Sequence, residues 1–262
     1  MNKIFDTNLI RLCSHNLPIP IINHAGIFSI LSSRCPSVKK LRVDKASSFQ
    51  DMMTYSSTLL EELELHRASF LLQPKCLDNY PALMSLRYTP SFRCDSAQME
   101  GIIAAAPAVL RTLSLELPSL TANDVLNAIS RRLFLIESLS IQGSYECGML
   151  SEESLLKISR KCLFMTHLEV ASTKSVSDIN MDVAAFMTLS KCPSLKYVRL
   201  KYDDALVTSL SAVLRQSDSV KKVIFWERKK WIKASKWILM SKQIENVQRE
   251  FPNREIQLEA II

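Results

Sequence analysis

One apolar pattern recurs along most of the chain: an aliphatic residue, two variable residues, an aliphatic residue, one variable residue and a final apolar residue. It occurs eight times, at residues 38–43, 60–65, 83–88, 110–115, 136–141, 165–170, 195–200 and 220–225. The central residues of neighbouring copies lie 22 to 30 positions apart. Eight copies in order at near-regular intervals indicate a repeat architecture.

Each copy predicts a short β-strand that is followed by a helix. Alternate side chains of a strand point to opposite faces, so Leu41 and Val43 turn inward while Arg42 turns outward. Residues 151–158 begin a helix, with a capping serine, acidic residues in the first turn and apolar residues at helical spacing. The ranges 97–106, 123–132, 182–191 and 205–215 predict helices in the same way. Because no single unit can enclose its own apolar face, the units must stack into an α/β solenoid with an inner parallel β-sheet and outer helices.

The residues that precede two of the strands carry a family resemblance. Cys35-Pro36-Ser37-Val38 and Cys192-Pro193-Ser194-Leu195 resemble the Cys-Pro-x-Leu segment that leads into strands in F-box leucine-rich repeat proteins. The chain resembles a leucine-rich repeat protein of this ribonuclease-inhibitor-like kind over about residues 36 to 258. The resemblance implies a horseshoe-shaped solenoid and a role as a substrate receptor in ubiquitin ligation.

The repeats predict one solenoid domain in three parts. Residues 1–35 are expected to form an N-terminal cap or a degraded repeat, 36–230 the leucine-rich repeats, and 231–262 a C-terminal helix and final strand. Residues 10–12 and 256–258 are candidates for further strands at the two ends. Leu17-Pro18, Ile21-Ile22 and Ile27-Phe28 resemble the opening of an F-box, but their stretched spacing favours a capping helix instead.

Leucine-rich solenoids usually bind partners on the concave face, where parallel strands present their outward side chains in a preformed array. The strand alternation predicts the following candidates for protein binding on this face: Arg42, Glu64, Arg87, Glu169, Tyr197, Arg199, Lys201, Lys222 and Trp226. Aromatic and arginine side chains are the usual anchors of protein interfaces, which favours Tyr197, Arg199 and Trp226. The alternative is a solvated sheet face with no partner.

The net charge of +7 is concentrated in one segment. Residues 215–254 hold eleven basic and four acidic residues, and the rest of the chain is balanced. Three tryptophans lie among these basic residues, a composition that can stack on nucleic-acid bases. The candidates for RNA or ribonucleoprotein contact are Arg228, Lys229, Lys230, Lys233 and Lys236. Alternatively, the spacing of Trp237, Met240, Ile244, Val247 and Phe251 predicts a helix that packs on the core.

The sequence offers little support for a catalytic, cofactor or metal site. It has four glycines and none of the phosphate-binding, hydrolase or zinc-protease motifs, so we expect no enzyme activity, cofactor or small-molecule substrate. Seven dispersed cysteines without a Cys-x-x-Cys pair argue against a disulfide framework and a metal site. Cys35, Cys162 and Cys192 are expected to be small buried apolar residues.

No apolar stretch approaches the roughly 20 residues of a membrane span, so no membrane contact is expected. Asp6 lies where a signal peptide would carry its apolar run, which favours the cytoplasm or the nucleus.

The expected function is a non-enzymatic scaffold that binds a protein partner on the concave face, and the resemblance implies a substrate receptor of an F-box type ubiquitin ligase. RNA binding through the basic segment is the alternative. A third possibility is a regulator like the ribonuclease inhibitors or the activators of small GTPases. The chain does not show clearly either the acidic face of the former or the placed arginine and acidic tail of the latter.

Overall fold

The computed structural model describes residues 21–22, 38–44, 56–68, 72, 74–91, 96–117, 122–143, 149–172, 180–228 and 233–261. Within them ten strands form one sheet in which every neighbouring pair is parallel. In spatial order the strands are β1 (Ile21–Ile22), β2 (Lys40–Asp44), β3 (Glu62–Ala68), β4 (Ser85–Pro90), β5 (Thr112–Leu117), β6 (Ser138–Gly143), β8 (His167–Ser172), β10 (Tyr197–Lys201), β11 (Lys222–Arg228) and β12 (Glu255–Ile261). A separate small sheet pairs β7 (Met149–Leu150) with β9 (Asn180–Met181).

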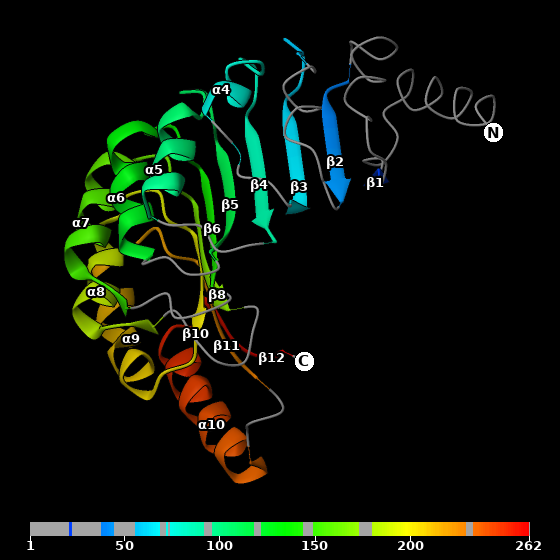
Figure 1. Ribbon diagram of the computed structural model, residues 1–262. Coiled ribbons are helices and arrows are strands. Elements are labelled where there is room, and N and C mark those ends of the chain that lie inside the picture. Colours follow the sequence, from blue (N-terminus) through cyan, green and yellow to red (C-terminus); the bar gives the residue numbers. More distant parts are fainter. Residues whose placement is uncertain are drawn as a thin grey trace.

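The helices lie along one side of the curved sheet, as Figure 1 shows. They are α4 (Pro74–Leu77), α5 (Ser96–Ala105), α6 (Ala122–Arg132), α7 (Glu152–Lys161), α8 (Val183–Thr188) with a 3-10 turn η1 (Leu189–Lys191), α9 (Asp204–Gln216) and α10 (Ala234–Glu250). No described helix covers the concave face (Figure 1). This arrangement confirms the predicted α/β solenoid with an inner parallel sheet and outer helices.

The core lies between the sheet and the helices because the strands are in register. Leu63, Leu86, Leu113, Leu139 and Leu168 are aligned across five neighbouring strands, and all are at most 1% exposed. Full burial of one such side chain stabilises a fold by about 1.5–3 kcal/mol, so this aligned row fixes both the strand register and the stacking.

Polar caps fix where several helices begin. Ser151 accepts a hydrogen bond from the backbone N–H of Ser154 at the start of α7, and Asp182 does the same for Ala185 at α8. Asp203 accepts hydrogen bonds from two backbone N–H groups at α9. These caps satisfy donors that have no partner within the helix.

The strands begin two residues later than the apolar pattern does. The first aliphatic residue of the copies from β3 onward, such as Leu60, Leu83 or Leu110, is buried just before its strand, and Val38 before β2 is partly buried. That position therefore anchors the connection from helix to strand.

At the two ends of the chain, one prediction is confirmed and the other is wrong. Residues 256–258 do form a strand, within β12. Ile21-Ile22 forms a strand paired with β2, so the prediction of a capping helix is wrong at these residues. The weak copy at 10–12, Cys35 and the rest of the F-box-like segment lie outside the described residues.

Candidate protein-binding face

The concave face of β2 to β6 contains a hollow of about 380 Å³. Its lining combines three arginines with one acidic residue and several polar residues: Arg42, His66, Arg67, Arg87, Thr89, Glu116 and Gln142. Two of these, Arg42 and Arg87, are among the predicted binding residues. The excess of guanidinium groups gives the hollow a positive character, which suits an anionic group of a partner.

Arg67 reaches this hollow only because β3 is irregular. Strict alternation after Leu63 and Leu65 would turn Arg67 toward the core. A bulge between Leu65 and Ala68 inserts one extra residue, and Arg67 adopts a positive φ of 51° while Ala68 becomes the buried residue. This conformation costs a non-glycine residue about 1–3 kcal/mol, and such costs concentrate at functional sites. Sequence alternation alone missed this residue.

Arg87 occupies the centre of the row of outward side chains and is half-buried. Its neighbour in register on β3, Glu64, lies 3.2 Å from the His66 ring nitrogen Nε2 and 3.6 Å from Nε of Arg42. The neighbour on β5 is Ser114. Within the described residues, Arg87 has no hydrogen bond or ion pair. Its guanidinium donors are therefore available to a ligand.

Arg42 adds a second unsatisfied group on the same side. Within the described residues its buried Nε makes no hydrogen bond, although the Glu64 carboxylate lies 3.6 Å away as an ion-pair partner. A buried donor without a hydrogen bond is costly, and a carboxylate in the hollow would satisfy it.

The C-terminal part of the concave face has a different arrangement, because its charges pair internally. Arg199 on β10 contacts Glu169 on β8 at 2.5 Å and Glu259 on β12 at 3.1 Å. Ser140 on β6 donates a hydrogen bond to Glu169 at 3.2 Å. Burial by itself would lower the pKa of Arg199, but its hydrogen bonds and charge contacts with the two carboxylates outweigh burial and raise the pKa.

Three further predicted residues lie near this bridge. The rings of Tyr197 and His167 are 5.4 Å apart, and burial raises the pKa of Tyr197. The ammonium of Lys222 is 2.7 Å from Glu255. Lys201 is half-buried at the end of β10. That these residues bind a partner stays a prediction.

Trp226 is not available to a partner, which corrects the prediction that it is a binding anchor. Its side chain is 0% exposed, and its indole Nε1 donates a hydrogen bond of 2.9 Å to the carbonyl of Val170 on β8. The pairing of β8 with β10 extends only to Glu169 and Arg199, one position short of that carbonyl. The indole therefore satisfies an acceptor that the sheet leaves unpaired.

The basic segment is described only in part. Lys233 and Lys236 are exposed at the start of α10. Lys229, Lys230 and the side chain of Arg228 are not among the described parts of the structure. Met240 and Ile244 are buried, so the predicted packing of this helix on the core is confirmed. RNA contact stays a prediction.

The structure places the described cysteines as the sequence suggested. Cys162 and Cys192 are buried, and burial raises the pKa of the first thiol to about 11 and of the second to about 12. Their thiols stay protonated at neutral pH and act as apolar side chains. Among the described residues no cluster of His, Cys, Asp and Glu is suited to a metal ion, and no helix is long and apolar enough to cross a membrane.

Comparisons with known proteins give no family. No protein-family model matches the chain, and no curated protein matches it. A yeast structure of the complex of Rad7 and Elc1 is similar over 78% of this chain and 66% of the matched chain, at 15% identity and a TM-score of 0.35. This chain thus spans slightly less than two thirds of that one.

Two structures of an arginine decarboxylase of Paramecium bursaria Chlorella virus, one with bound agmatine, match 99% of this chain and 68% of theirs. Their identity is 10% and their TM-score 0.27. Likenesses at these scores carry no argument about function, which has to come from the surface itself.

Proposed function

We propose that this chain is a non-enzymatic interaction scaffold, and that the hollow around Arg87 binds an acidic segment of a protein partner. The observation that carries the proposal is the half-buried side chain of Arg87, which has no hydrogen bond or ion pair within the described residues. Three arginines with one acidic residue complement a carboxylate better than a neutral or basic side chain.

The bulge at Arg67 supports the same site. A regular strand would direct this side chain to the core, and the bulge instead adds a third arginine to the hollow at a cost in backbone energy. The concave position also suits an extended or irregular segment of a partner, because the side chains form a preformed array across neighbouring strands.

The finer part of the proposal is that the partner is a substrate for ubiquitin ligation. Its support is the resemblance of the Cys-Pro-Ser segments before β2 and β10 to those of F-box leucine-rich repeat proteins. In this role the chain would act in the cytoplasm or the nucleus and would hold the substrate without performing chemistry on it.

Affinity purification of the tagged full chain, at low and high salt, tests the proposal against a matched pair of variants. Arg87→Glu reverses the charge in the hollow. Lys75→Glu makes the same change of charge on α4, where the lysine is exposed. We expect Lys75→Glu to keep the proteins that the unmodified chain recovers, and Arg87→Glu to lose at least one of them. Recovery of a cullin and its F-box adaptor would support the ligase role.

Two results would contradict the proposal. Identical protein sets from the two variants would show that the hollow is not the binding site. RNA recovered without proteins, and lost at high salt, would assign the function to the basic segment, since phosphate binding weakens steeply with salt.

A further inference from the structure

A second surface lies at the edge of the solenoid where the strands begin. A two-residue turn precedes each of the strands β3, β4, β5, β6, β8 and β10, and the register places the turns of neighbouring repeats side by side. In order along the edge, these pairs are Thr58-Leu59, Pro81-Ala82, Ala108-Val109, Phe134-Leu135, Leu163-Phe164 and Pro193-Ser194. Only the fourth and fifth consist of two large apolar residues.

These four side chains face solvent. Their exposed fractions are 46% for Phe134, 39% for Leu135, 50% for Leu163 and 57% for Phe164. Because Ser138 pairs with His167 in the sheet, the two turns are direct neighbours. Single exposed apolar residues are ordinary on protein surfaces, whereas a contiguous group marks an interaction site.

The fold itself does not need large apolar residues at these positions. Pro193 and Ser194 occupy the equivalent turn of the next repeat, before an equally well-formed strand. The apolar residue that anchors each turn is the next one along the chain, Ile136 or Met165, and both are buried. The exposed residues of the two turns therefore do not anchor the turns to the core.

Basic residues border the apolar group. Arg131 and Arg132 end α6, and Arg160 and Lys161 end α7. Cations at helix C-termini are stabilised by the helix dipole, which accounts for their position. Arg131 lies 3.8 Å from Glu100, whereas within the described residues Arg132, Arg160 and Lys161 have no polar partner.

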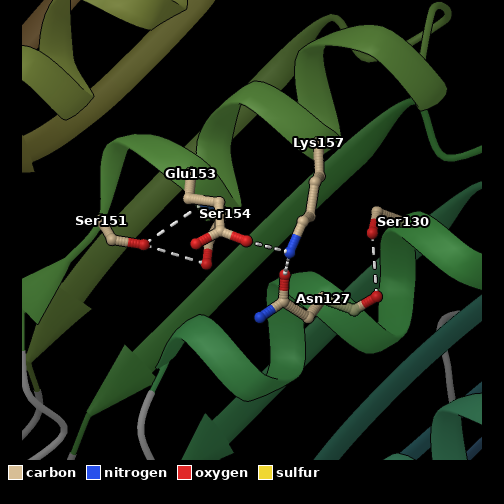
Figure 2. A network of polar contacts seen from close by, with 6 residues as sticks. All are labelled: Asn127, Ser130, Ser151, Glu153, Ser154 and Lys157. Carbon is tan, nitrogen blue, oxygen red and sulfur yellow. Dashed lines mark hydrogen bonds and ion pairs between the residues drawn. The ribbon is translucent and has the colours of Figure 1, made fainter.

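A hollow of about 460 Å³ between α6 and α7 adjoins these residues. Phe134 forms part of its wall, with Arg131, Arg160 and Lys161 beside it, and none of its lining residues is acidic. Figure 2 shows how its walls are held together: Lys157 of α7 donates hydrogen bonds to Asn127 of α6 and to Glu153. The hollow is therefore lined by residues that bridge two neighbouring repeats.

We propose that this surface, formed by Phe134, Leu135, Leu163, Phe164, Arg160 and Lys161 and here called the α6–α7 edge, binds an amphipathic acidic segment of a protein partner. A large apolar side chain of the segment enters the hollow beside Phe134, and its carboxylates face Arg160 and Lys161. A protein segment fits better than a membrane, because an inserted side chain fills a recess whereas a bilayer covers protruding residues. The α6–α7 edge lies apart from the Arg87 hollow, so the two sites can be occupied together.

Selection of random peptides on phage against the purified full chain tests this proposal. We expect the selected peptides to combine a large apolar residue with Asp or Glu. Their affinity should fall at least about tenfold in the double variant Phe134→Thr and Phe164→Ser, which uses residues that the chain itself places at these positions in other repeats. The double variant Arg160→Glu and Lys161→Glu should weaken the same peptides through their acidic residues.

The matched control is Leu59→Ser, an equally exposed turn residue at the far end of the edge. It should leave the affinity unchanged. Peptides that lose affinity in Arg87→Glu and not in the α6–α7 variants bind the concave hollow instead, so failure here is distinct from failure of the proposed function. A selection that yields no peptide sensitive to the α6–α7 substitutions overturns the proposal. Sedimentation of the chain with phosphatidylserine vesicles, abolished by the Phe134 and Phe164 substitutions, would also overturn it and assign the surface to a membrane.

Discussion

Arg87 and Arg199 occupy the same row of the concave face, at the third position of β4 and of β10, yet they have opposite surroundings. Arg199 has carboxylates on β8 and on β12 within reach, and both contact it. The carboxylate of Glu64, which is in register with Arg87 on the neighbouring strand, is already near Arg42 and His66. The same residue type at the same strand position therefore holds the sheet together in one place and is left for a ligand in the other.

The difference shows that side chains up to two strands away decide whether an arginine on the concave face remains available to a ligand. Arg199 reaches Glu259 across β11, where Ile224 is in register with Arg199, Trp226 is in register with Glu259, and both are buried. The buried indole of Trp226 lies two residues further along the same strand. The C-terminal end of the face is thus closed by its own side chains, whereas the Arg87 hollow stays open.

Removal of Trp226 should give the largest effect. Trp226→Ala should lower the free energy of unfolding by about 3–5 kcal/mol, because it empties a fully buried site. Trp226→Phe keeps most of the ring but leaves the Val170 carbonyl without its donor, at a cost of about 1–3 kcal/mol. Urea unfolding followed by circular dichroism measures both. Unchanged stability in both variants would mean that this end of the face is open.

Arg199→Ala should have the next largest effect. It leaves two partly exposed carboxylates without their shared cation, and we expect a loss of about 1–2 kcal/mol in the same unfolding measurement. Glu169→Ala should lower the free energy of unfolding much less in the Arg199→Ala variant than in the unmodified chain, since both substitutions remove the same ion pair. Additive effects would contradict the bridge.

Lys222→Ala tests an ion pair at the exposed margin of the closed region. The hydrogen bond to Glu255 raises the pKa of Lys222, but water screens the pair. We expect thermal unfolding to shift little, and to shift less as salt is added. A loss as large as that for Arg199→Ala would show that surface pairs also hold this region.

Arg87→Ala should have the smallest effect on the free energy of unfolding, within about 0.5 kcal/mol, because Arg87 has no polar partner among the described residues. Calorimetry of this variant beside Arg199→Ala compares the two arginines directly. Clear destabilisation would show that Arg87 has a structural role, and the case for the hollow as a binding site would weaken accordingly.

Much of the fold could be predicted because burial in a repeat is a local property. Each copy of the apolar pattern, such as Leu110 to Leu115, contains the anchor of its turn and two inward residues of its strand. The prediction of a capping helix is wrong at Ile21-Ile22, since a two-residue apolar segment has no periodicity that separates helix from strand.

The candidate site could be predicted only in part. Alternation correctly placed Arg42 and Arg87 on the concave face. It missed Arg67, because a bulge shifts the alternation without a sequence signal as clear as glycine. It also favoured Trp226 as an anchor, because alternation gives the face of the sheet but not what covers that face.

The apolar pattern is enough to predict the repeat, the strand register and the α/β solenoid, because the spacing of the apolar residues forces each unit to bury its face against the next. Which outward side chains remain available depends instead on contacts between distant parts of the chain. Arg199 meets Glu259 across 60 positions of the chain, and the turns at Phe134 and Phe164 become neighbours only when β6 pairs with β8. Such contacts depend on distances between side chains from separate strands and turns, which no local pattern records.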